Sequence, residues 1–82
     1  METYKIVALP YGQSSEIIRA ANINNFRKLM ALRYEGTSMG FEVWKIYTQE
    51  DFQFLGTIQA VNYSGTMYWN DRRFSLKTGR LL

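Results

Sequence analysis

The sequence predicts an α+β fold in which an N-terminal strand and a helix precede an antiparallel β-meander of four or more strands. Helix-forming residues gather in the first half of the chain, whereas β-branched and aromatic residues separated by turn signals fill the second half. The 82 residues suit one small domain and contain no internal repeat, low-complexity tract or linker. We therefore expect a single α+β domain over residues 1–82.

The first two expected elements are a short strand and a helix. The strand covers residues 4–9 and ends at Pro10, because proline donates no hydrogen bond to a ladder. Ser14 and Ser15 are suitable N-cap residues, and Glu16 favours the positive end of a helix. The spacing of Ile17, Ile18 and Ala21 then predicts a helix over about residues 15–25.

Residues 27–35 have two interpretations. As a helix, they place Phe26, Leu29 and Met30 on one face, and their composition is rich in strong helix formers. As a strand, Leu32 and Tyr34 alternate with Arg33 and Glu35. The composition favours extending the helix to about Leu32, and the strand remains the alternative.

Turn signals recur every several residues after Gly36 and divide the rest of the chain into strands. The predicted strands cover residues 41–47, 52–63, 66–69 and 72–76, and all are rich in β-branched and aromatic residues. Two-residue turns at 64–65 and 70–71 would join neighbouring strands as antiparallel hairpins. The second half of the chain is therefore predicted to be an antiparallel meander.

These two turns fix a register, and the alternation of side chains then divides the predicted sheet into two faces. The 70–71 turn sets Tyr68 opposite Arg73, and the 64–65 turn sets Tyr63 opposite Thr66 and Val61 opposite Tyr68. The apolar face is the expected core, which we expect the helix to cover. It comprises Phe52, Phe54, Ile58, Ala60, Met67, Trp69, Phe74 and Leu76. The more polar face comprises Gln53, Leu55, Thr57, Gln59, Val61, Tyr63, Thr66, Tyr68, Arg73, Ser75 and Lys77.

The composition argues against an enzyme. The chain has no His and no Cys, so it lacks the usual zinc ligands, His-activated nucleophiles and disulfides. Glu50 and Asp51 are adjacent carboxylates, but they fall in a predicted turn. The glycine-bearing stretch 36–40 lacks the Lys-Ser/Thr ending of a phosphate-binding loop. We expect a non-enzymatic protein with no metal ion and no cofactor.

The positive charge is concentrated near the C-terminus. Residues 1–69 hold six cations and six acids, so the net charge of +3 comes from the last thirteen residues. Single-stranded nucleic acids are commonly bound by cations at the phosphates and aromatic rings under the bases. The sequence therefore predicts a nucleic-acid surface on the polar face, although an ordinary solvated face has the same pattern. Its candidate residues are Tyr63, Tyr68, Arg72, Arg73, Lys77 and Arg80.

The alternative function is protein interaction. The same residues could contact an acidic protein, since Trp, Tyr and Arg dominate interface hot spots. The chain would then be an inhibitor or adaptor of a larger enzyme, of the kind that mobile elements encode. An exposed edge strand at residues 4–9 could form a homodimer by strand addition. No apolar run is long enough to span a membrane, and a cytoplasmic location is the expectation.

Overall fold

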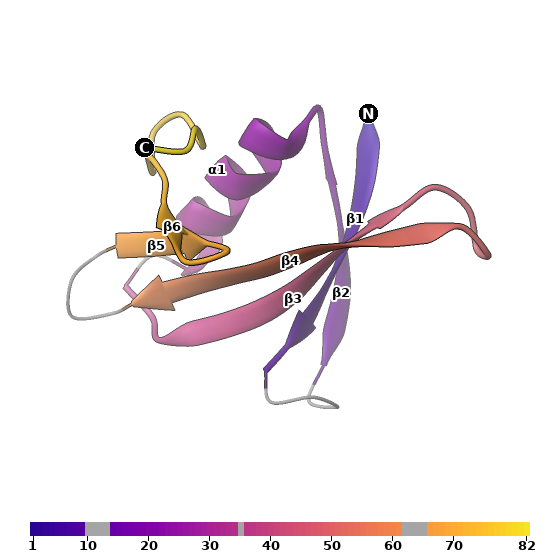
Figure 1. The fold of residues 1–82 in the computed structure, drawn as a ribbon, viewed down its shortest axis with the longest axis horizontal. Coiled ribbons are helices and arrows are strands. Elements are labelled where there is room, and N and C mark those ends of the chain that lie inside the picture. Colours follow the sequence, from indigo (N-terminus) through magenta and orange to yellow (C-terminus); the bar gives the residue numbers. More distant parts are fainter. Residues whose placement is uncertain (10–13, 35, 62–65) are drawn as a thin grey trace.

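The computed structural model describes residues 1–9, 14–34, 36–61 and 66–82, which form six strands and one helix (Figure 1). The strands pair antiparallel throughout, in the order β2-β1-β3-β4-β5-β6. The predicted α+β class, with its C-terminal meander, is confirmed. The elements are β1 (Glu2–Ala8), β2 (Ser15–Ala20), α1 (Ile23–Tyr34), β3 (Met39–Ile46), β4 (Phe52–Val61), β5 (Thr66–Trp69) and β6 (Arg72–Arg73).

The predicted helix start is wrong. Residues 15–20 form strand β2, paired with β1, and the helix begins only at Ile23. Asn22 is the N-cap, because its Oδ1 accepts a hydrogen bond from the backbone N–H of Asn25 at 2.9 Å. The β-branched pair Ile17 and Ile18 suits the hairpin with β1 better than a helix. The helical interpretation of residues 27–32 is confirmed, and α1 continues to Tyr34.

β1 is not an edge strand, contrary to the expectation for residues 4–9. It lies between β2 and β3, and β2 takes the edge position. The error follows from the helix start, because a chain without β2 leaves β1 at the margin of the sheet. α1 has 12 residues. Neither it nor any other described segment makes a helix with the length and hydropathy of a membrane span.

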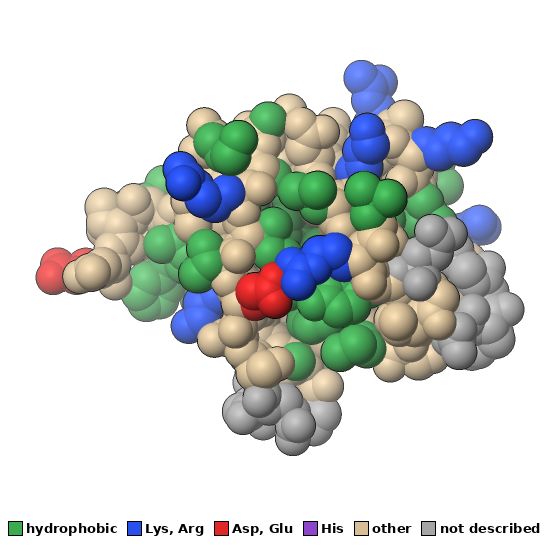
Figure 2. Space-filling model, turned by 180° about the vertical axis from the view of Figure 1, so that it is seen from behind, with side chains coloured by type: hydrophobic (Ala, Val, Ile, Leu, Met, Phe, Trp, Pro, Cys, Tyr) green, Lys and Arg blue, Asp and Glu red, His purple; other side chains and the backbone are tan. Residues whose placement is uncertain are grey.

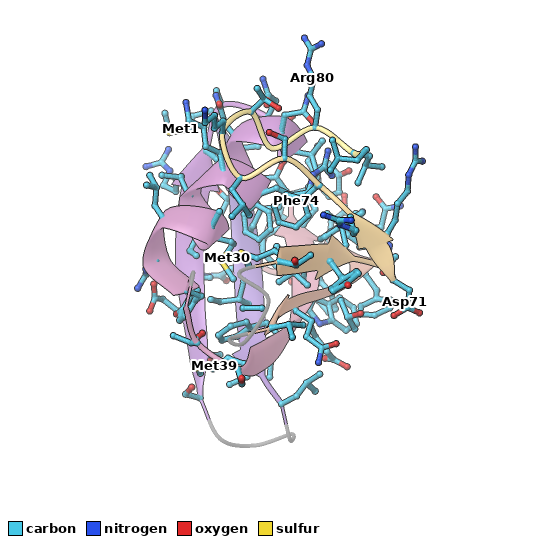
Figure 3. All side chains as sticks on the ribbon, turned by 90° about the vertical axis from the view of Figure 1, so that its left-hand side faces the viewer. Met1, Met30, Met39, Asp71, Phe74 and Arg80 are labelled. Atoms are coloured by element: carbon cyan, nitrogen blue, oxygen red, sulfur yellow. The ribbon has the colours of Figure 1, made fainter. Side chains whose placement is uncertain are left out.

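The core lies between α1 and one face of the sheet. Phe26 and Met30 project from α1 and are completely buried, and the Phe26 ring packs 4.6 Å from that of Tyr4 on β1. Figure 3 shows Met30 between the helix and the sheet. The strands contribute alternate residues to the same layer. These are Tyr4, Ile6, Ala8, Ile18, Ala20, Phe41, Val43, Ile58, Ala60, Met67 and Trp69.

The predicted core face of the C-terminal half is confirmed in part. Ile58, Ala60, Met67, Trp69 and Phe74 are buried in the core, as expected, and Leu76 packs against it. Phe52 and Phe54 are 54% and 48% exposed, so their assignment to the core is wrong. A change in the pairing of β3 with β4 explains the difference.

A β-bulge in β4 reverses the orientation of its first residues. Val43 pairs with Gly56, but the next residue of β3, Trp44, pairs with Phe54, so Leu55 is extra. Gly56 has a φ of +130°, which favours glycine. Phe52 and Phe54 therefore share the face of Trp44, and Leu55 packs against the core from the helix side.

The two predicted hairpin registers have different outcomes. Tyr68 pairs with Arg73 as predicted, and Asn70 and Asp71 have φ angles of 49° and 66°, as a type I′ turn requires. Val61 pairs with Thr66 rather than with Tyr68, so the 64–65 register is wrong by two residues. A two-residue shift preserves the alternation, and the faces of β5 are as predicted.

The last predicted strand is shorter than expected. β6 ends at Arg73, and the chain then turns, with Ser75 N–H donating to the carbonyl of Arg80 at 2.8 Å. The side chain of Arg27 holds this turn against α1, because its Nε donates to the carbonyl of Gly79 at 2.6 Å. Residues 75–77 therefore leave the sheet, and the C-terminal segment lies beside the helix (Figure 1).

Candidate functional site

No helix of the described residues lies over the sheet face opposite α1, and we call this face the open face. Residues that alternate with the buried core positions project from it. On β1 and β3 these are the neighbours of Ile6 and Val43, and on β4 the bulge adds Phe52 and Phe54. The charged, aromatic and larger aliphatic side chains of the open face are Lys5, Val7, Ile17, Arg19, Glu42, Trp44, Ile46, Phe52, Phe54, Tyr68 and Arg73.

One row of side chains crosses four strands of this face. Lys5 pairs with Ile17 on one side and with Trp44 on the other, and Trp44 pairs with Phe54. Adjacent strands lie about 4.8 Å apart, so the row extends roughly 14 Å across the sheet. It places a cation directly beside an aromatic pair.

The aromatic side chains at the β3–β4 end form a cluster. The Trp44 ring lies 5.0 Å from Phe54 and 5.8 Å from Phe52, in tilted and edge-on geometries that aromatic pairs favour. Trp44 is half-buried, and its Nε1–H donates to Oε1 of Glu42 at 3.2 Å. This hydrogen bond and the two phenyl rings fix the orientation of the indole.

A hollow of about 390 Å³ lies on the open face over β1 and β3 and reaches the turn that joins β3 to β4. Its walls include Lys5, Trp44 and Phe52, together with the aliphatic side chains of Val7 and Ile46. Ligand sites commonly have this size and this mixture of apolar walls with a few polar groups. The open face can therefore offer an aromatic surface, an apolar recess and an adjacent ammonium group to one ligand.

The charges on the open face are mainly positive. Lys5, Arg19 and Arg73 are its cations, and Glu42 is the acid that lies between them on the central strand. Arg19 and Arg73 are exposed and lie towards opposite edges of the sheet. An elongated polyanion crossing the strands would meet Arg19 and Lys5 on the neighbouring strands β2 and β1, and Arg73 at the opposite edge.

Two of the sequence-predicted residues lie together on this face. Tyr68 on β5 is half-buried and pairs directly with the exposed Arg73 on β6. α1 covers the opposite face, as expected, so neither side chain belongs to the core. Tyr63 lies outside the described residues.

The other three candidates lie elsewhere. Arg72 pairs with Trp69 and so projects towards the helix side, where its Nε donates to the carbonyl of Leu82 at 3.0 Å. Lys77 and Arg80 are exposed on the C-terminal turn, and Arg80 extends away from the body of the protein (Figure 3). The placement of Lys77 on the polar sheet face is wrong, because the strand ends before it.

The sequence reasoning missed the aromatic cluster. Phe52 and Phe54 were counted as core because strict alternation along β4 was assumed, and Lys5 and Trp44 were not assigned to a surface. The sequence did contain one signal of the bulge, because Gly56 lies inside the predicted strand 52–63, which is the longest of the four predicted strands in the second half of the chain. A glycine inside a strand pattern often marks a bulge.

Two buried ionisable side chains on the helix side of the sheet, Tyr4 and Arg27, have structural roles. Burial and the hydrogen bond that Tyr4 donates to Glu2 at 2.5 Å raise the pKa of the Tyr4 phenol, so this group stays protonated. Burial lowers the pKa of Arg27, which contacts Gly79 and lies over the Trp69 ring at 5.5 Å. Among the described residues, no cluster of three or more acidic groups could hold a metal ion.

Comparison with known proteins adds no family to these observations. No protein-family model, no curated protein and no solved structure matches the chain.

Proposed function

We propose that this protein binds single-stranded nucleic acid on the open face of its sheet. The observation that carries the proposal is the exposed aromatic cluster of Trp44, Phe52 and Phe54 beside the ammonium group of Lys5. A sheet that leaves aromatic rings uncovered provides a surface on which unpaired bases can stack.

The bases would contact the aromatic side chains. Phe54 is half exposed, and the Trp44 indole beside it is held by its bond to Glu42. Stacking on such a ring contributes about 1–3 kcal/mol per base and tolerates different sequences. Tyr68 offers a second ring further along the sheet, next to Arg73.

The phosphates would contact Lys5, Arg19 and Arg73. Their distribution from one edge of the sheet to the other supports a nucleic-acid strand that runs across the sheet from β2 to β6. In this arrangement Tyr68 and Arg73 keep the roles that the sequence predicted. Arg72 lies on the helix side of the sheet, and Lys77 and Arg80 lie on the C-terminal turn, so none of the three is on this path.

Fluorescence anisotropy with labelled single-stranded oligonucleotides tests the proposal, with a duplex of the same sequence for comparison. Contacts to about three phosphates should give a slope of roughly −2 for the logarithm of affinity against the logarithm of salt concentration. Tighter binding of the single strand and this slope support the proposal. The absence of binding at low salt would refute it.

A matched pair of aromatic variants locates the surface. Phe54 is 48% exposed on the open face, and Tyr47 is 52% exposed at the end of β3 on the helix side. Phe54→Ala should weaken binding by roughly tenfold, the loss expected from one stacked base. Tyr47→Ala should leave the affinity unchanged, and an equal loss in both would place the contact elsewhere.

A matched pair of arginine variants separates the open face from the C-terminal turn. Arg73→Gln should weaken binding and reduce the salt slope by about 0.7, because one phosphate contact is lost. Arg80→Gln removes a similarly exposed charge from the turn and should leave the slope unchanged. A similar decrease of the slope in both variants would mean that Arg80 also contacts the nucleic acid.

Protein binding is the second candidate function, and the aliphatic part of the open face favours it. Val7, Ile17 and Ile46 lie beside the aromatic cluster and provide no stacking surface for a base. An acidic protein with an apolar patch would use both the cations and these side chains. A purified partner that binds the wild type and Tyr47→Ala, but not Phe54→Ala or Tyr68→Ala, would support this alternative.

A further inference from the structure

The two edges of the sheet differ in their protection. At the β6 edge, the backbone N–H of Leu82 donates to the carbonyl of Arg73 at 3.0 Å, and Phe74 forms a bridge with Leu81. The C-terminal segment therefore occupies the hydrogen-bonding positions next to β6. At the other edge, no strand of the described chain pairs with the outer side of β2.

The pairing of β1 with β2 shows which groups of β2 point outward. Ala8 N–H donates to the carbonyl of Ser14 at 2.9 Å, which makes these two residues a hydrogen-bonded pair. Such pairs recur at every second position, so Glu16 and Ile18 also bond to β1. The backbone N–H and C=O groups of Ser15, Ile17 and Arg19 then point away from the sheet. These residues are the ones available to another strand.

β2 carries two charged side chains, Glu16 and Arg19, but lacks the other features that usually protect an edge strand. Its six residues include no proline and no lysine, and its pairing with β1 runs without a bulge. Ile17 projects from the middle of the strand and is 56% exposed. A regular edge strand with a β-branched apolar residue at its centre is a template for strand pairing.

Apolar side chains also lie beside this edge on the helix side. Leu29 and Leu32 of α1 are exposed, Leu32 to 72%, and a hollow of about 410 Å³ separates them from Ala20 and Ala21. Figure 2 looks onto the side that carries α1 and β2 and shows hydrophobic side chains spread over it. Both layers of the fold therefore leave apolar surface at the β2 edge.

We infer that β2 pairs antiparallel with β2 of a second copy of this chain. The twofold axis passes between the two Ile17 residues, which form a hydrogen-bonded pair. Ser15 of each copy then lies opposite Arg19 of the other, so all three outward-pointing residues exchange hydrogen bonds. This register places no like charges opposite each other, and Glu16 faces Ile18 of the second copy.

The neighbouring register fits less well. Centring the axis on Ile18 would set Ile17 opposite Arg19 and leave Ser15 facing Ala21, which lies beyond the end of β2. Within the strand, only Ile17 and Arg19 would then exchange hydrogen bonds. A second copy is favoured over an unrelated strand because the Ile17-centred register makes this edge complementary to itself.

The dimer would extend the open face. A twofold axis perpendicular to the sheet keeps both helices on one side and both open faces on the other. The row of Ile17, Lys5, Trp44 and Phe54 would then continue into the same row of the second copy. The dimer does not rest on the proposed function, because oligonucleotide binding and self-association are measured separately.

Sedimentation equilibrium tests the association, with two variants at Ile17. Ile17→Pro removes an outward N–H that β1 does not use, so circular dichroism should show a folded protein. Ile17→Lys leaves the backbone intact and adds a charge at the axis, where it would face its own copy. The wild type should reach twice the mass of the chain, and each variant should raise the dimer dissociation constant at least tenfold.

Cross-linking tests the register, because the chain contains no cysteine. In the proposed dimer the Ile17 Cα atoms are about 5.5 Å apart, within the range that a disulfide spans. Ile17→Cys should therefore oxidise to a covalent dimer. Arg19→Cys has a thiol on the same face but lies four positions out of register with its copy, so it should remain uncross-linked.

Three results would overturn the inference. They are a wild type that remains monomeric into the millimolar range, a dimer that persists in both Ile17→Pro and Ile17→Lys, and preferential cross-linking of Arg19→Cys.

Discussion

The side-chain amide of Asn70 fills the space that a β-carbon on Gly56 would occupy. A Cβ built on Gly56 would lie 1.9 Å from Oδ1 of Asn70. That oxygen accepts a hydrogen bond from the Thr57 N–H at 2.9 Å, and Nδ2 donates to the carbonyl of Leu55 at 3.2 Å. The turn between β5 and β6 therefore supplies hydrogen-bond partners to the backbone of Leu55 and Thr57, on either side of Gly56.

Gly56→Ala should destabilise the protein by about 2 kcal/mol or more, because it forces a side chain into a positive φ and displaces the Asn70 amide. Chemical denaturation measures the change. Asn70→Gly keeps the turn conformation and loses the amide, at a cost of about 1–2 kcal/mol. The double variant should be more stable than the sum of the two losses predicts, since the steric conflict is then absent. Strict additivity would contradict the contact.

Gly79→Ala should cost more than Gly36→Ala, although both residues have a positive φ. A Cβ on Gly79 would lie 1.8 Å from the carbonyl oxygen of Asn24, whereas a Cβ on Gly36 meets no atom within 4 Å. Gly36→Ala should therefore cost about 1 kcal/mol for the backbone conformation alone. Gly79→Ala adds a clash with α1, and thermal unfolding should show at least twice that loss. Equal losses of stability would mean that the C-terminal turn can move away from α1 at no energetic cost.

Arg27→Met should destabilise the fold by about 2–4 kcal/mol. Arg27 is 5% exposed, and the methionine would leave the carbonyl of Gly79 without its donor. Lys28→Met is the control, because Lys28 is the next residue of α1 and its side chain is exposed. This variant should change stability by less than about 0.5 kcal/mol. Urea denaturation followed by tryptophan fluorescence also reports the loss of the guanidinium over Trp69. A stability change no larger than that of the control would contradict the role of Arg27.

The ion pair between Glu16 and Arg33 should make stability depend on acid pH. The hydrogen bond from Arg33 lowers the pKa of Glu16 below its ordinary value of 4.5. The pair therefore stabilises the fold above about pH 4.5, and this contribution is lost as the pH falls through the lowered pKa. Glu16→Gln should flatten the acid side of a plot of melting temperature against pH. Arg33→Gln should flatten it equally, and an unchanged profile in either variant would contradict the prediction.

Sequence patterns predicted the C-terminal meander well because its signals are local. The Asn70-Asp71 turn fixed the pairing of Tyr68 with Arg73, and the buried residues from Ile58 to Phe74 follow from it. The N-terminal half was harder, because Ser15 and Glu16 resemble the start of a helix. Their actual conformation depends on pairing with β1, which is a tertiary contact.

The candidate site was only partly predictable for the same physical reason. Tyr68 and Arg73 could be paired from one turn, whereas the aromatic cluster depends on a bulge between β3 and β4. Arg72, Lys77 and Arg80 were candidates because they belong to the C-terminal charge excess, but Arg72 projects to the helix side of β6, and Lys77 and Arg80 lie on the turn that follows it. Charge along the sequence indicated the net excess but not the side of the sheet that carries it.

The bulge gives β4 one residue more than its pairing with β3 requires. Deleting Leu55 would join Phe54 directly to Gly56, and both would keep their present partners, Trp44 and Val43. Every other side chain of the strand would stay on the face where it now lies. A one-residue deletion at the bulge therefore leaves the core face and the open face of the sheet unchanged. A one-residue deletion elsewhere in β4 would move the side chains on one side of it to the opposite face.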